Sequence, residues 1–147
     1  MGIAEKMTLV FSGSFLLVGL LTGVWKYAEI ARSESASASP YVDIAHRASL
    51  LYAFASLVIL HFVQLSPYAE WMTISFAAMP QIFFALAILT YVIHGFLKDT
   101  DNQLRKPYRL GRGTLPGWVI HGFMVLLILA EIGGFLALFV GAMQTIF

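Results

Sequence analysis

The chain has 147 residues, of which 59% are hydrophobic and only 12% are charged, and its net charge is +1. Ordinary soluble domains are about 45–50% apolar and about 25% charged, so this chain lacks the polar surface that a water-soluble protein needs. Its mean hydropathy of +0.81 indicates an integral membrane protein. The small net charge gives no indication of a nucleic-acid partner. The absence of cysteine excludes disulfides, iron–sulfur clusters and thiolate-ligated haem.

Four apolar stretches predict four membrane-spanning helices, because each contains the ~20 residues needed to cross ~30 Å of hydrocarbon. We expect an all-α fold, an antiparallel up-and-down four-helix bundle embedded in the lipid bilayer. A single transmembrane domain would then cover residues 1–147. The predicted helices span about residues 4–31, 42–66, 71–97 and 115–145.

The first predicted helix contains spaced glycines at positions 13, 19 and 23. Such small residues let helices approach closely in lipid. The serine-rich segment RSESASASP follows and predicts a loop. The second helix is unusual because it carries His46 and Arg47 near its start. Polar and ionisable groups at membrane depth are costly and usually functional.

The third helix contains Pro80 at mid-membrane, so we expect a kink that neighbouring helices tolerate. The basic connection KDTDNQLRKPYRLGRG follows, and the fourth helix is predicted to begin near Pro116. Glu131 lies deep in this helix, next to Gly133 and Gly134. We expect its carboxyl group to make a structural hydrogen bond at a close crossing with another helix or subunit.

The basic residues are distributed unevenly along the chain. Eight of the nine lysines and arginines lie near the first or the third connection between helices, and only Lys6 lies at the other side. The positive-inside rule therefore predicts that both of these connections are cytoplasmic and both termini are outside. The protein is predicted to be a multi-pass protein of a bacterial-type cytoplasmic membrane.

With this topology, His46, Tyr91, His94 and His121 are expected within one ~10 Å slab near the inner face. Imidazole groups bind zinc, copper or haem iron. A zinc site would usually need three or four closely placed ligands, often with a carboxylate, and the slab is poor in acids. Haem needs one or two histidines, an apolar cavity and cations for its propionates. The alternative is that these histidines only form hydrogen bonds to neighbouring helices.

For the haem interpretation, the candidate cofactor-binding residues are His46, His94 and His121, with Arg47 beside the first of them. Arg32 or Arg112 would meet propionates at the rim. The metal ligand is expected to be His46.

The pattern is similar to that of the styrene oxide isomerase family, small four-helix membrane proteins that convert epoxides to aldehydes. The similarity rests on the glycines of the first helix, the polar loop, Ala45-His46 and Tyr91. It implies a haem b held by His46 where the subunits of a homotrimer meet, and a substrate-orienting hydroxyl on Tyr91. The sequence departs from the family at Tyr52, where the family has Asn, and at Phe83, where it has an acid. Tyr52 keeps a hydroxyl that could contact the epoxide oxygen.

The resemblance implies that ferric haem acts as a Lewis acid, opens an apolar aryl epoxide and lets a 1,2-shift give the aldehyde. In this reading Tyr91 and Tyr52 are the catalytic residues. Two other functions stay open from the residues. One is a haem b electron-transfer or anchor subunit with two histidine ligands, and the other is a cofactor-free membrane assembly subunit.

Overall fold

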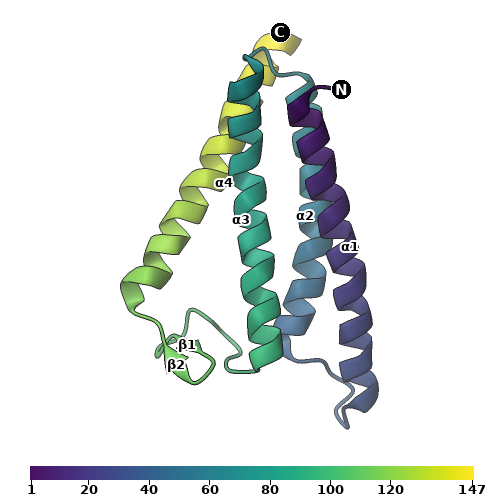
Figure 1. Cartoon of the computed structure of the whole chain (residues 1–147), viewed down its shortest axis with the longest axis vertical. Coiled ribbons are helices and arrows are strands. Elements are labelled where there is room, and N and C mark those ends of the chain that lie inside the picture. The colour runs from purple at the N-terminus through teal and green to yellow at the C-terminus, as the bar shows by residue number, and fades with distance from the viewer.

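The computed structural model describes all 147 residues and contains four long helices (Figure 1). The helices are α1 (Ile3–Arg32), α2 (Pro40–Gln64), α3 (Glu70–Leu97) and α4 (Gly117–Ile146). Each is long and apolar enough to cross a membrane. The predicted four-helix membrane bundle is therefore confirmed, and each predicted helix end lies within two residues of the observed one.

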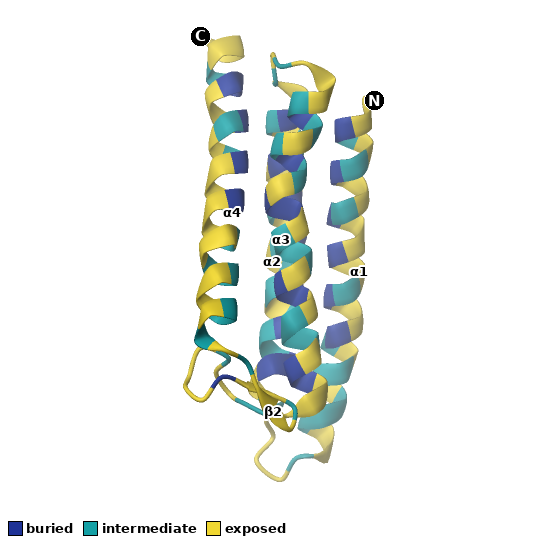
Figure 2. Cartoon of the chain, turned by 60° about the vertical axis from the view of Figure 1, so that its left-hand side comes forward, coloured by how far each residue is buried: buried dark blue, intermediate teal, exposed yellow.

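Successive helices run in opposite directions, so both chain termini lie at one end of the bundle and both long connections lie at the other (Figure 1). The most extensive packing is between α1 and α2, while α4 packs mainly on α3. The sides of the helices that face away from the bundle carry mostly exposed residues, and the buried residues line the inner faces (Figure 2). This exposed apolar exterior is what a bilayer would cover.

Ion pairs fix the end of the bundle that carries the long connections. Glu29 on α1 accepts hydrogen bonds from the backbone N–H and the hydroxyl of Ser39, both at 2.7 Å. The same carboxylate lies 3.0 Å from Nζ of Lys98, which follows α3. Lys26 pairs with Asp43 of α2 at 2.6 Å. These contacts join three helices and both connections at one level.

Small polar side chains make hydrogen bonds across the buried helix contacts. The Ser12 hydroxyl on α1 donates to the Ala53 carbonyl on α2 at 2.9 Å. The buried amide of Gln81 on α3 donates to the Thr8 hydroxyl at 3.2 Å and to the Ala77 carbonyl at 2.9 Å. Such bonds satisfy polar groups that have no water available in a membrane.

The close crossing of α3 and α4 is built on Pro80 and Gly134. Pro80 has no N–H, so the Phe76 carbonyl one turn earlier lacks its usual helical donor. A Cβ atom at Gly134 would lie 2.6 Å from this carbonyl oxygen and 2.8 Å from Cδ of Pro80. The neighbouring Gly133 faces open space. Only one of the two adjacent glycines therefore makes the predicted close crossing.

Below this crossing α4 diverges from the other helices, and the connection between α3 and α4 fills part of the space at its base (Figure 1). The connection contains a small antiparallel ribbon, β1 (Arg109–Leu110) and β2 (Gly113–Thr114), an addition to the all-α prediction. Gly111 opens its turn with φ of +60°, which glycine adopts without steric cost. The ribbon lies at the wide end of the molecule, between the base of α4 and the other helices (Figure 1).

Candidate functional site

The His46 side chain is held against α1 through one of its two ring nitrogens. Its Nδ1 lies 2.8 Å from the Gly19 carbonyl oxygen. Because a carbonyl only accepts hydrogen bonds, Nδ1 carries the proton. Nε2 then holds the lone pair, and no hydrogen bond to this atom is found in the chain. Histidines that bind metals commonly have this arrangement, in which a backbone carbonyl fixes the tautomer and the ring orientation.

Gly23 provides the space for this imidazole. A Cβ atom at position 23 would lie 2.9 Å from Cε1 and 3.0 Å from Nδ1 of His46. Gly19 similarly accommodates Leu50, whose Cδ2 would lie 2.6 Å from a Cβ atom. Two of the glycines predicted to allow close helix approach, Gly19 and Gly23, therefore leave the space on α1 into which His46 and Leu50 of α2 pack. We call this pair of glycines the cradle.

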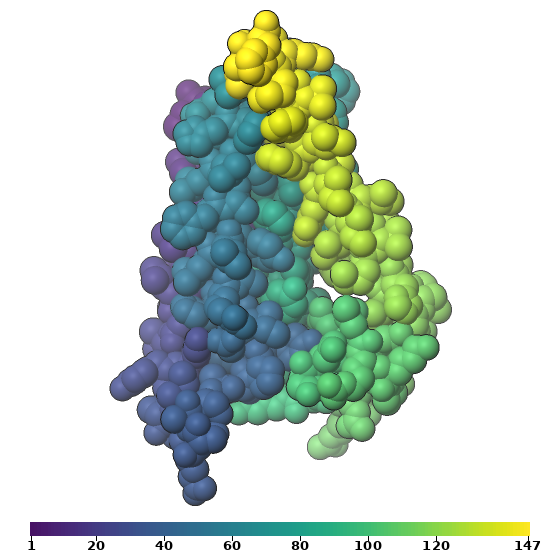
Figure 3. Space-filling model, turned by 180° about the vertical axis from the view of Figure 1, so that it is seen from behind, coloured from purple at the N-terminus to yellow at the C-terminus, as the bar shows by residue number.

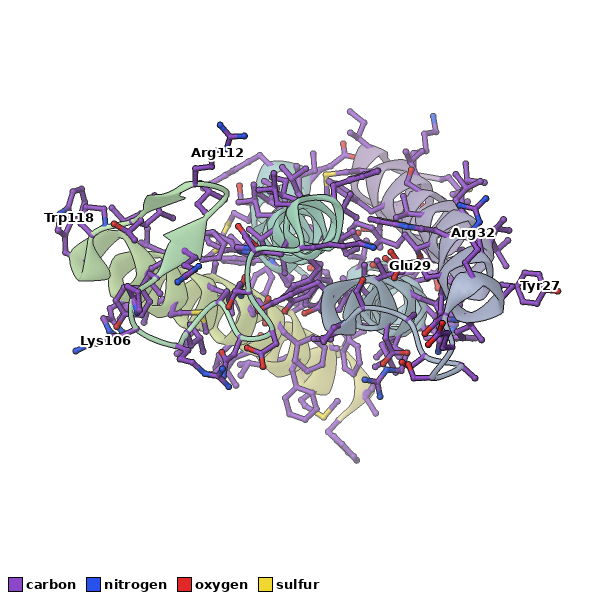
Figure 4. The ribbon with its side chains drawn as sticks, turned by 90° about the horizontal axis from the view of Figure 1, so that it is seen from below. Tyr27, Glu29, Arg32, Lys106, Arg112 and Trp118 are labelled. Carbon is purple, nitrogen blue, oxygen red and sulfur yellow. The ribbon has the colours of Figure 1, made fainter.

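The charged groups next to His46 are paired with each other. Arg47 lies 2.7 Å from Asp43, which also binds Lys26. The Arg47 side chain is 65% exposed, so it remains accessible to an anion. Arg32 and Arg112 lie well apart when the bundle is seen from the end with the long connections, Arg32 at the end of α1 and Arg112 beside the ribbon (Figure 4). These two side chains do not share one rim.

The second histidine, His94, makes a buried contact with the carboxylate of Asp99. Its Nδ1 lies 2.7 Å from Oδ1 of Asp99, and the side chains are only 8% and 3% exposed. The other carboxylate oxygen of Asp99 accepts a hydrogen bond from the Gly111 N–H at 2.5 Å. Burial raises the pKa of the Asp99 carboxyl, but the bonds from His94 and Gly111 outweigh it and hold the pKa below its usual value. The pair fixes the ribbon to the end of α3.

The third histidine, His121, binds the connection before α4. Its Nε2 lies 2.9 Å from the hydroxyl of Tyr108, and the two rings meet edge to face. Tyr108 is only 6% exposed. This contact attaches the diverging end of α4 to the ribbon.

All three histidines lie toward the end with the long connections, as predicted, but they do not converge. Each has its own partner: the Gly19 carbonyl for His46, Asp99 for His94 and Tyr108 for His121. No group of three or more histidine, aspartate or glutamate side chains could hold a metal ion. Within one chain, each of the three histidines is therefore held separately through one ring nitrogen, and the other ring nitrogen of each makes no hydrogen bond.

The two candidate catalytic tyrosines lie between α2 and α3. Tyr91 stacks on Tyr41, with ring centroids 6.1 Å apart. Tyr52 stacks on Phe84 at 4.2 Å with nearly parallel rings, and the two phenols of Tyr52 and Tyr91 lie next to each other. Tyr52 follows His46 by six residues, which places it about 120° around the helix. The imidazole and the two phenols therefore face different neighbours.

The larger cavities lie away from His46. A cavity of about 740 Å³ runs along α1 and α3. Another of about 600 Å³ lies between α2, α3 and α4 and contains Glu131. A third, of about 510 Å³, lies beside Glu29 and Lys98, and a smaller one of about 250 Å³ lies beside His94 and the ribbon. None of these is lined by His46, so a porphyrin bound to it would have to lie on the outer face of a single chain.

Sequence reasoning missed the roles of Asp99, Tyr108 and Gly111. They lie in a connection that its composition identified only as polar and basic. Nothing in the spacing between Asp99 and His94 distinguishes a buried partner from a solvated one. The structure shows that this connection carries the partners of two of the three histidines.

Comparisons of this chain with protein-family models, with characterised proteins and with solved structures found no match.

Proposed function

We propose that the protein is a membrane-embedded haem b isomerase that opens an apolar aryl epoxide and yields an aldehyde. His46 is the proposed iron ligand. The observation that supports this role best is the asymmetry of its imidazole: the Gly19 carbonyl binds Nδ1, and Nε2 has no hydrogen bond in the chain. An axial haem ligand requires both properties, a fixed ring and a free nitrogen.

The proposed site lies between copies of the chain. No large cavity of one chain reaches His46, so a second copy is needed to cover a porphyrin on the outer face. This requirement agrees with the homotrimer that the resemblance implies. It also offers a way to bring Tyr52 and Tyr91 of one copy near His46 of another, because the imidazole and the phenols face different sides of one chain.

When bound, the haem would supply the Lewis acidity that opens the epoxide ring without net redox change. The residues of the chain would supply orientation and a dry environment. In the proposal, the Tyr91 hydroxyl donates a hydrogen bond to the epoxide oxygen and sets its position, and Tyr52 provides a second hydroxyl beside it. Phe84, stacked on Tyr52, excludes water that would capture the developing cation. Arg47 would bind a propionate with its exposed guanidinium group.

The proposal includes an orientation. The structure brings both long connections to one end of the bundle (Figure 1), and eight of the nine lysines and arginines lie in or near them. We propose that this end is cytoplasmic and that both termini are outside. A reporter fused to the C-terminus should then be accessible from outside the cell, and a reporter inserted after Glu34 should be accessible only from the cytoplasm.

The decisive experiment is an absorption spectrum of the detergent-purified chain, followed by an assay with styrene oxide. We expect a Soret band from a ferric haem that binds added ligands, and formation of the aldehyde. His46→Ala should remove the band, whereas His61→Ala, at an exposed position, should retain it. A low-spin spectrum of two bound imidazoles would favour the electron-transfer alternative. Purified protein without a Soret band after haem reconstitution would favour the cofactor-free alternative.

A further inference from the structure

The cavity between α2, α3 and α4 has an apolar lining with one ionisable group. Its volume is about 600 Å³, within the range of sites that bind drug-sized molecules. Seen from behind, the molecule is hollowed between α4 and the other helices (Figure 3). The aromatic residues of the lining are Phe84, Phe135 and Phe139, and Glu131 supplies the carboxyl group. We call this cavity the Glu131 cleft.

The carboxyl group of Glu131 has no partner in the bundle. Its Oε1 is inaccessible to solvent and makes no hydrogen bond. No lysine, arginine or histidine forms an ion pair with it, although six ion pairs occur elsewhere in the chain. The structural hydrogen bond expected from the sequence is therefore not made within one chain. An isolated carboxylate in an apolar interior is costly, so the group is either protonated or paired with a charge from outside the chain.

Two other buried atoms, the Ser56 hydroxyl and Oε1 of Gln81, also lack partners. Neither borders the cleft, and neither side chain ionises. Glu131 is the one unpartnered group that combines a charge with access to a cavity. A binding site for an organic ion requires both features.

We propose that the Glu131 cleft binds a lipophilic organic cation, such as a hydrophobic amine or phosphonium ion. The Glu131 carboxylate would pair with the positive charge, and the three phenylalanine rings would contact the apolar groups. Aromatic faces attract cations, most strongly where water is excluded. The Phe135 and Phe139 rings, with centroids 6.3 Å apart, lie on the same helix as Glu131. The cleft does not include His46 and does not depend on a bound haem, although it shares Phe84 with the proposed epoxide site.

Charge balance predicts that a cation entering the cleft exchanges for the proton of the Glu131 carboxyl group. The protonated carboxyl group loses its proton as the cation enters, so one proton leaves for each cation bound. The titratable side chains of the neighbouring helices that lie near Glu131 are Tyr52 on α2 and Tyr91 on α3. Comparison with Glu131→Gln separates the contribution of this carboxyl group to the pH dependence of binding from that of the other titratable groups.

The test is equilibrium dialysis of tetraphenylphosphonium against the detergent-purified full chain between pH 5 and pH 8. We expect saturable binding whose affinity rises with pH, by up to about tenfold per unit while the carboxyl group is protonated. Glu131→Gln should weaken binding at least about tenfold, the loss that one buried charge pair of ~1.4 kcal/mol would give, and remove the pH dependence. Glu34→Gln, in the exposed first connection, is the matched control and should bind as the wild type does.

Neutral triphenylphosphine oxide separates charge recognition from apolar binding. We expect it to bind at least about tenfold more weakly than the phosphonium ion. Equal binding of the neutral compound, or unchanged phosphonium binding by Glu131→Gln, would overturn the proposal. So would the absence of saturable phosphonium binding by the folded wild-type chain. If Glu131→Gln instead changes the oligomeric state and leaves cation binding intact, the carboxyl group belongs to a subunit contact.

Discussion

Gly23 on α1 and His46 on α2 touch so closely that a Cβ atom at position 23 would lie 2.9 Å from Cε1 of the imidazole. The ring is therefore confined between two helices, with Nδ1 on the Gly19 carbonyl. The sequence of α1 controls the position of a side chain on α2, and this coupling can be tested with a single methyl group.

Gly23→Ala should displace the His46 ring from the Gly19 carbonyl. Loss of such an orienting contact typically lowers metal affinity by about 10–100-fold, so if His46 holds haem as proposed, haem retention should fall by this order. The measurement is haem occupancy from the Soret absorbance at fixed protein concentration.

Gly13→Ala is the matched control for this change, because nothing lies within 4 Å of a Cβ atom at position 13. It should leave haem occupancy unchanged and can gain up to about 1 kcal/mol in helix propensity. Equal occupancy in both variants would show that the cradle does not position the ligand.

The crossing of α3 and α4 offers a second pair of adjacent substitutions. A Cβ atom at Gly134 would overlap the Phe76 carbonyl and Pro80, whereas Gly133 faces open space. We expect Gly134→Ala to destabilise the bundle by about 1–3 kcal/mol, the usual cost of overpacking. Gly133→Ala should be neutral or slightly stabilising. Unfolding by denaturant in detergent micelles measures both, and equal stability of the two variants would contradict the observed crossing.

The buried pair of His94 and Asp99 predicts an acid-dependent loss of stability. The pKa of Asp99 is lowered in the folded chain, so the carboxylate stabilises the fold at pH values above its unfolded pKa of about 3.9. This contribution is lost as the pH falls below that value and through the folded pKa. At neutral pH, Asp99→Asn should cost about 1–3 kcal/mol, as expected when a hydrogen bond to a buried charged group is removed.

Thermal unfolding of the wild type and Asp99→Asn, measured from pH 7 down to pH 3, tests this prediction. The stabilities of the two proteins, plotted against pH, should approach each other at the acid end. There, protonation removes from the wild type the Asp99 charge that the substitution removes at every pH. Asp101→Asn is the control, since the Asp101 side chain is 57% exposed. Curves that remain parallel over the whole range would contradict a stabilising role for the Asp99 charge.

The hydroxyl of Tyr108 should hold the base of α4. Tyr108→Phe removes its hydrogen bond to His121 and should cost about 1 kcal/mol, with faster amide exchange over residues 117–121. Tyr27→Phe provides the control, because Tyr27 is exposed and points away from the bundle (Figure 4). Unchanged exchange in Tyr108→Phe would mean that the ribbon is not what restrains this end of α4.

The number, length and order of the helices could be predicted because hydropathy and length largely determine a membrane span. The rotation of each helix about its own axis, which decides which residues face the neighbouring helices, could not be predicted. In lipid, an outward face is as apolar as an inward one, so the pattern does not distinguish the side of α2 that faces α1 from the side that faces α3. For this reason the shared level of His46, His94 and His121 was predicted, whereas their separate partners were not.

Long-range ion pairs were equally inaccessible from local spacing. Lys26 and Glu29 are three residues apart on one helix, a spacing that allows two side chains to pair. In the structure each pairs with a residue of another element, Lys26 with Asp43 and Glu29 with Lys98. Such partners become visible only when the helices and their connections are placed in three dimensions.

The divergence of α4 below its crossing with α3 gives the molecule a tapered outline (Figure 1). A single chain with this outline displaces more lipid area in the leaflet that surrounds the long connections than in the opposite leaflet. Unless a neighbouring copy packs against the narrow end, the protein occupies a larger area in one leaflet than in the other. The shape thus couples the packing of one helix to the curvature that the surrounding bilayer prefers.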